Sequence, residues 1–202
     1  MDDIDRYRLF LEHSLTPLRF QHSLGVMEVM GELAELYALD SRQARIAGLL
    51  HDAAKDRDLE YQYSLAAEAG MEFQYPCERL PLYLHGPVGA YLVAKELGIT
   101  DGLILQAIAK HTYADSELDL KTLLPWCLRA ADILAPTQEW PGMRKLKSVV
   151  YAGKLEESAL LQIGWLIEYF QELNIPVHPT LTASFQSLSS KMNVRDSFFE
   201  RW

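Results

Sequence analysis

Hydrophobic residues recur at helical spacing along nearly the whole chain. Thr16-Pro17 is typical of an N-cap followed by proline at the first helical position. The helix that it starts is predicted to place one largely apolar set on a single face: Leu18, His22, Val26, Val29, Leu33 and Leu36. Asp40 or Ser41 is expected to cap a second helix. Its corresponding face carries Ala44, Ala47, Gly48 and His51.

The rest of the chain continues this pattern. Residues 57–81 form a looser region, and Gly86-Pro87 is expected to start a helix that runs to about Leu97. Thr100 is predicted to cap a helix that carries Ile104, Ile108 and His111. Further helices are expected at 119–134, 155–173 and 180–192, with a break near Gly142. We find no convincing strand or repeat in the sequence, so we predict one all-α domain over residues 1–202.

Composition and charge narrow the class of protein. The formal charge is −9, which disfavours general binding to nucleic acid, since that binding depends on Lys and Arg. The cysteines Cys77 and Cys127 form no CxxC pair and fit a reducing compartment. The first residues lack an apolar run of signal-peptide length, and no stretch approaches about 18 apolar residues. We therefore expect a cytoplasmic protein that does not bind membranes.

Polar residues with apolar neighbours carry the candidate chemistry. Asp52 directly follows an apolar run, and Asp132 lies four residues after Leu128 on the same helical face. An isolated Asp there is costly unless it is paired or bound to a metal. Together with four histidines, these carboxylates predict a site for two transition-metal ions such as Fe, Mn, Co, Ni or Zn. The six candidate ligands are His22, His51, Asp52, His85, His111 and Asp132.

Each of these residues also has a simpler explanation. A single histidine in such a position is more often a hydrogen-bonded core or helix-end residue than a ligand, and Asp52 alone would fit a helix end. The joint occurrence of six such residues favours the metal site. His13 lies just before the Thr16-Pro17 helix start and is expected at the surface, and His178 is expected to be structural or exposed.

Five segments occur in this order along the chain: LRFQHSLGV, AGLLHDAAKD, LHGPVGAYL, IAKHT and AADILAP. Together they resemble the HD superfamily and, within it, the YqeK family of bacterial symmetrical diadenosine tetraphosphate hydrolases. The resemblance implies an all-helical HD-domain bundle, a dinuclear iron centre, hydrolysis of diadenosine tetraphosphate to two ADP, and a homodimer. It implies the same six metal ligands. His85 and His111 indicate the dinuclear branch, because a mononuclear HD site uses only the other four.

Three positions depart from that family. The segment that usually reads ADYIEPNRDFPG is ADILAPTQEWPG here, so Ala135 replaces an acidic residue and Gln138 replaces an arginine. The glycine usually found shortly after HT is also missing. An arginine binds phosphate bidentately and glutamine does not, so these changes leave the exact nucleotide substrate open.

Three further residues are candidate substrate contacts. Lys55 lies four residues after His51, Arg19 lies three residues before His22, and Thr112 follows His111. Asp52 and Lys55 are the candidate catalytic residues. Each contact has an alternative: a solvated lysine at a helix end, a surface salt bridge of Arg19, or a helix-end hydroxyl bond of Thr112.

Three other functions compete with the tetraphosphatase. One is an HD phosphatase that acts on another nucleotide, and the second is a metal-containing nucleotide-binding regulator with little turnover, for which Gln138 is the argument. A dinuclear oxygenase on the same scaffold is disfavoured, because the segments resemble the phosphohydrolase branch.

Overall fold

The computed structural model describes residues 3–73, 81–111, 122–136, 141–192 and 196–200. Within these ranges the chain forms helices and no strand, which confirms the all-α prediction. The helices are α1 (Asp3–Ser14), α2 (Pro17–Leu36), α3 (Ser41–Leu50), α4 (Leu59–Glu68), α5 (Pro81–Leu97), α6 (Gly102–Lys110), α7 (Leu123–Leu134), α8 (Met143–Tyr151), α9 (Leu155–Glu172), α10 (Pro179–Met192) and the short 3-10 helix η2 (Asp196–Phe199).

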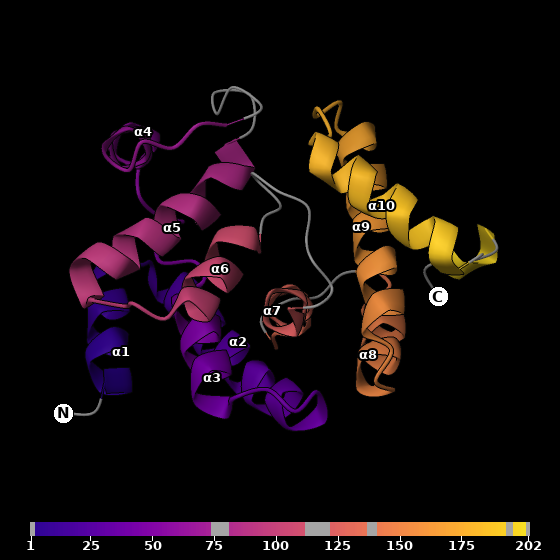
Figure 1. Cartoon of the computed structure of the whole chain (residues 1–202), viewed down its shortest axis with the longest axis horizontal. Coiled ribbons are helices and arrows are strands. Elements are labelled where there is room, and N and C mark those ends of the chain that lie inside the picture. Colours follow the sequence, from indigo (N-terminus) through magenta and orange to yellow (C-terminus); the bar gives the residue numbers. More distant parts are fainter. Residues whose placement is uncertain (1–2, 74–80, 112–121, 137–140, 193–195, 201–202) are drawn as a thin grey trace.

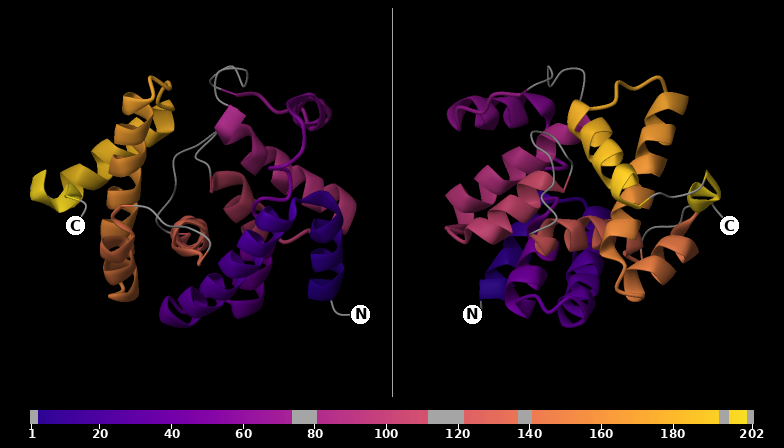
Figure 2. Two further views of the ribbon diagram at one scale, coloured as in Figure 1. Left: turned by 180° about the vertical axis from the view of Figure 1, so that it is seen from behind. Right: turned by 45° about the vertical axis from the view of Figure 1, so that its right-hand side comes forward.

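Helix α7 occupies the centre of the arrangement. It packs against α2, α3 and α6 on one side and against α8 and α9 on the other. Figure 1 shows α7 end-on between the indigo-to-magenta helices and the orange-to-yellow ones, and the views in Figure 2 agree. Most residues of α7 are buried as a result, including Trp126 and Leu128. A polar side chain on α7 is therefore held among neighbours from both sides of the molecule.

Helices α2 and α3 pack closely because of a glycine. A Cβ atom added at Gly48 would lie 2.9 Å from Cγ of Met30 and 3.0 Å from Cα of Met27. The absence of a side chain at Gly48 lets the two helices approach, and it brings His51, at the end of α3, beside His22 of α2. Their ring centroids are 5.4 Å apart.

Several predicted element limits were wrong, each for a local reason. The region expected to be loose contains α4, whose N-cap Asp58 accepts a hydrogen bond from Tyr61 and whose Leu65 is buried against α5. Helix α5 begins at Pro81, five residues before the predicted start, and encloses Pro87. The buried Tyr83 and Leu84 hold the turn that precedes this proline.

Helix caps and exposed faces also differ in part from the prediction. Asp101, and not Thr100, caps α6 by accepting hydrogen bonds from the next turn. Asp40 caps α3 as one of the two predicted candidates. Leu18 is 76% exposed and Leu36 is 43% exposed, although both were placed on the buried face of α2. Helix α2 has 20 residues and its partner α3 has 10, so the ends of α2 extend beyond the helix that covers its middle.

Candidate metal centre and active site

Five of the six predicted metal ligands are buried and lie together with the sixth, Asp132 of α7. His22 comes from α2, His51 and Asp52 from the end of α3, His85 from α5 and His111 from the end of α6. The side chain of Asp132 is 34% exposed and faces the pocket. Residues from five helices therefore converge at one place.

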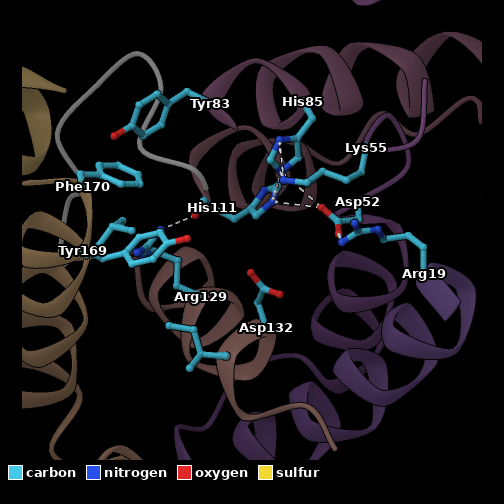
Figure 3. Close-up of a pocket in the computed structure, with 12 residues that line it drawn as sticks. Arg19, Asp52, Lys55, Tyr83, His85, His111, Arg129, Asp132, Tyr169 and Phe170 are labelled. Carbon is cyan, nitrogen blue, oxygen red and sulfur yellow. Dashed lines mark hydrogen bonds and ion pairs between the residues drawn. The ribbon is translucent and has the colours of Figure 1, made fainter. Parts of the chain in front are cut away.

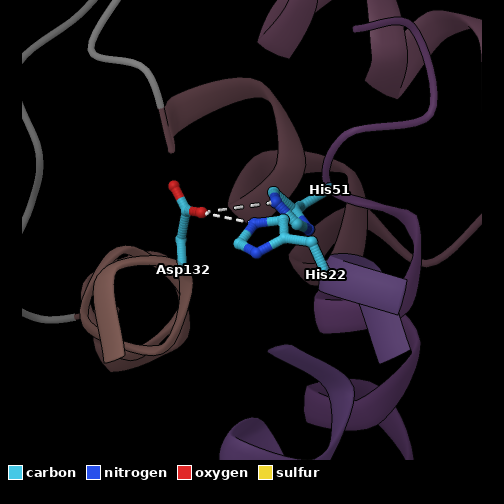
Figure 4. Close-up of side chains that lie close together, drawn as sticks. All are labelled: His22, His51 and Asp132. Atoms are coloured by element: carbon cyan, nitrogen blue, oxygen red, sulfur yellow. Dashed lines mark hydrogen bonds and ion pairs between the residues drawn. The ribbon is translucent and has the colours of Figure 1, made fainter. Parts of the chain in front are cut away.

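The first group of potential ligands consists of His22, His51 and Asp132 (Figure 4). Nε2 of His22 lies 2.9 Å from Oδ1 of Asp132, and Nε2 of His51 lies 3.6 Å from the same oxygen. The ligand atoms of this group are all within 4.8 Å of one another. This spacing suits binding of a single ion by the three side chains.

The second group consists of His51, Asp52 and His111, and His85 borders it. Oδ1 of Asp52 lies 3.3 Å from Nε2 of His85 and 3.7 Å from Nε2 of His111. Oδ2 of Asp52 lies 3.5 Å from Nε2 of His51. The two oxygens of Asp52 thus face different histidines, and the carboxylate lies between His51 on one side and His85 and His111 on the other.

The hydrogen bonds of His51 and His111 fit metal binding. Nδ1 of His51 donates to the carbonyl of Gly48 at 2.8 Å, and Nδ1 of His111 donates to the carbonyl of Ile108 at 2.6 Å. These bonds leave Nε2 of each ring with its lone pair toward the site. Nε2 of His51 is buried and has no hydrogen-bond partner among the described residues. A buried nitrogen in this state, beside two carboxylates, needs a proton or a metal ion.

Burial and charge oppose each other in setting the protonation states. Burial disfavours charged His51, but the carboxylates of Asp52 and Asp132 outweigh it and raise the pKa of His51 to about 9. Burial likewise works against ionised Asp52 and Asp132, yet the neighbouring histidines hold the pKa of both carboxyls below the usual range. Burial lowers the pKa of His85 to about 3. The carboxylates are therefore ionised at neutral pH, and His51 carries the proton that a metal ion would displace.

Two of the predicted substrate contacts lie at this site. Lys55 lies in the turn after α3, and its Nζ is 3.2 Å from each ring nitrogen of His85. Arg19 pairs with Oδ2 of Asp52 at 3.0 Å and with Asp56 at 3.6 Å. Both side chains line a cavity of about 330 Å³ (Figure 3). Thr112 and Gln138 lie outside the described residues.

The two histidines set aside in the sequence are not among the residues that line the cavity, although the ring of His178 lies 5.3 Å from that of Tyr83, which does. His13 is exposed, as predicted, and contacts only the carbonyl of Leu9 among the hydrogen bonds of the described chain. His178 is buried at the start of α10, and its Nδ1 accepts a hydrogen bond from the backbone N–H of Thr180. His178 therefore has a structural position, which is one of the two predicted outcomes.

Sequence reasoning missed Arg129, a buried cation on α7 that lines the same cavity. It lies one turn before Asp132, and its Nη1 donates to the carbonyl of His111. The signal was present in the sequence, because a charged residue inside the apolar run LPWCLRAAD is as unusual as Asp132 itself. Sequence reasoning also missed an aromatic wall, which consists of Tyr83, Tyr169 and Phe170.

Comparisons with known proteins agree with this site. The HD domain family model matches residues 19–137. The chain is 32% identical to proteins named bis(5'-nucleosyl)-tetraphosphatase, symmetrical, from Halalkalibacterium halodurans (86% of this chain, 90% of the relative) and Bacillus subtilis (89% and 94%). A crystal structure from Clostridium acetobutylicum, described as a predicted HD superfamily hydrolase involved in NAD metabolism, superposes with a TM-score of 0.86 at 29% identity. That match covers 95% of this chain and 99% of the other.

The HD domains of this family are metal-dependent, and the histidine and aspartate groups described above suit that chemistry. The family match covers most of the segments that carry these side chains, and the relatives align along nearly their full length. The chain therefore belongs to the HD-domain family and, within it, to the family of the symmetrical bis(5'-nucleosyl)-tetraphosphatases.

Proposed function

We propose that this chain hydrolyses diadenosine tetraphosphate symmetrically, to two ADP. The main support is the convergence of six potential metal ligands and three cations at one cavity. The names of the relatives describe the same activity. The reaction adds water across one phosphoanhydride bond. That bond is the central one, because two ADP form only if two phosphates remain with each adenosine.

The proposed cofactors are two transition-metal ions, with iron as the first choice and Mn, Co, Ni or Zn as alternatives. His22, His51 and Asp132 would hold one ion, and Asp52, His85 and His111 would hold the other. When bound, such ions supply Lewis-acid charge and lower the pKa of water toward about 7. Imidazole and carboxylate ligands without thiolate suit these metals.

The protein's own cations are proposed to bind the polyphosphate. Lys55, Arg19 and Arg129 border the cavity from different elements, so they offer positive charge on several sides of a substrate that carries only negative charge along its phosphates. Arg129 can offer two N–H groups in one plane to a phosphate. It thereby supplies a guanidinium in a chain in which Gln138 replaces the arginine usual in the family.

A nucleotide panel tests this proposal. Metal-replete protein is incubated with diadenosine tetraphosphate, ATP, ADP and AMP, and initial rates are compared by chromatography. We expect the highest kcat/KM on diadenosine tetraphosphate. A clear preference for a mononucleotide would make the chain an HD phosphatase of another specificity. Tight binding of diadenosine tetraphosphate without turnover would instead indicate a regulator.

A further inference from the structure

Part of the cavity wall comes from beyond the residues that the HD family model matches. That match ends at residue 137, whereas Leu166, Tyr169 and Phe170 belong to α9. Figure 3 shows Tyr169 and Phe170 on the opposite side of the pocket from Asp52 and Lys55. The pocket thus has a charged side, built by the HD segments, and an aromatic side, built mainly by α9.

The aromatic side chains differ in how accessible they are. Tyr83 and Phe170 are buried, and their rings stand perpendicular with centroids 5.8 Å apart, so they support each other as a floor. Tyr169 lines the cavity and yet is 49% exposed. An aromatic residue that is half exposed beside an apolar floor offers a ring face to a flat ligand.

We propose that Tyr169 stacks on one adenine of the dinucleotide, while the attached phosphates extend to Lys55 and Arg19 on the opposite side. The proposal rests on the proposed function and names the subsite for one nucleoside. A base offers a π-face that stacks on an aromatic ring, so the aromatic wall suits the base and the charged wall suits the phosphates. The cavity of about 330 Å³ lies at the small end of the usual range for ligand pockets, which suits one nucleotide half of the substrate.

A comparison of ADP binding with pyrophosphate binding distinguishes the contribution of the base to affinity from that of the phosphates. Both are titrated calorimetrically into metal-replete wild-type protein and into Tyr169→Ala. Loss of one base–aromatic stack is expected to weaken ADP binding roughly 5- to 100-fold. Pyrophosphate has no base, so its affinity should stay within about twofold, well below one stacking contact. Tyr169→Phe keeps the ring and should bind ADP like the wild type.

Leu173→Ala is the matched control. Leu173 lies one turn after Tyr169, is 50% exposed and does not line the cavity, so the change should leave both affinities unaltered. Unchanged ADP affinity in Tyr169→Ala, or an equal loss for ADP and pyrophosphate, would overturn the proposal. Product analysis of the wild type on the same preparation keeps the two claims apart. If the wild type cleaves the dinucleotide and Tyr169→Ala binds ADP as tightly as the wild type, only the stacking proposal is contradicted. If Tyr169→Ala selectively loses ADP affinity but the wild type does not cleave the dinucleotide, only the proposed function is contradicted.

Discussion

At the residue scale, the site depends on buried polar groups that stabilise each other only as a set. Asp52 contacts three histidines and Arg19, so replacing one partner leaves the other charges buried. His51 is fully buried and is common to both potential metal groups. Each of these residues therefore depends on its neighbours for charge compensation, and single substitutions should have large effects on activity.

We predict that His51→Ala and Asp52→Ala each abolish turnover of diadenosine tetraphosphate, because each removes a ligand from the potential metal groups. His13→Ala should leave turnover nearly intact, since His13 is exposed and does not line the cavity. Kinetics on variants whose folding is checked by circular dichroism decide the matter. A loss of turnover in His13→Ala equal to that in His51→Ala would mean that the wrong histidines were chosen.

His178→Ala should also keep its turnover, but the loss of the buried hydrogen bonds of His178 should lower the unfolding free energy by about 1–3 kcal/mol.

Arg129 gives a second prediction at this scale. Arg129→Gln removes a buried cation from the cavity, and hydrogen bonds to a charged group are worth about 1.5–3 kcal/mol, so kcat/KM should fall roughly 10- to 100-fold. Arg129→Lys keeps the charge but not the planar guanidinium, so its kcat/KM should lie between those of the wild type and Arg129→Gln. Metal content is measured in parallel, because Arg129 also holds the carbonyl of His111. Full kcat/KM in Arg129→Gln would exclude a phosphate contact; a loss explained by missing metal would assign Arg129 a structural role.

At the scale of elements, the close packing of α2 against α3 determines the distance between His22 and His51. The added Cβ of Gly48→Ala would lie 3.0 Å from the carbonyl oxygen of Val26, a backbone atom that cannot move alone. We expect a loss of about 1–3 kcal/mol in unfolding free energy from this overcrowding. Urea denaturation measures it. Gly102→Ala is the control, because nothing lies within 4 Å of its added Cβ. Equal stability of the two variants would contradict the packing argument.

The elements also show what the sequence could and could not predict. Helices α2, α3 and α9 were predicted to within about a residue or two, the usual uncertainty of helix ends. Helix α4 was missed because its short apolar face is recognisable only once α5 covers Leu65. The metal ligands were recognised as polar residues on apolar faces, and the family resemblance added their order. Tyr169 carried no such signal, because an aromatic residue in an amphipathic helix usually belongs to the core.

At the scale of the whole molecule, a connected set of buried apolar side chains runs from Tyr7 of α1 to Leu188 of α10. This continuity supports the proposal that residues 1–202 form one domain. No helix in the described part of the chain is long and apolar enough to cross a lipid bilayer. The HD segments and α9 meet across α7, so the cavity depends on both halves of the chain.

The metal content follows from that arrangement. We predict two transition-metal ions per chain, because the described residues offer two groups of nitrogen and oxygen ligands, with His85 bordering the second group. Elemental analysis of protein expressed with added iron and purified without chelator measures this. His85→Ala, which leaves His22, His51, Asp52 and Asp132 in place, should lower the content toward one ion. Full activity of the wild type with one ion or none would contradict the dinuclear proposal.

The most direct test of the central claim is the identity of the first products from diadenosine tetraphosphate. Early time points are separated by chromatography, and the reaction is run in ¹⁸O-labelled water to locate the phosphorus that gains oxygen. Symmetrical hydrolysis predicts ADP as the sole early nucleotide, with the label on the terminal phosphate of half of the ADP. ATP and AMP as the main early products would contradict symmetrical cleavage, and the absence of any dinucleotide cleavage by metal-replete protein would contradict the proposed function itself.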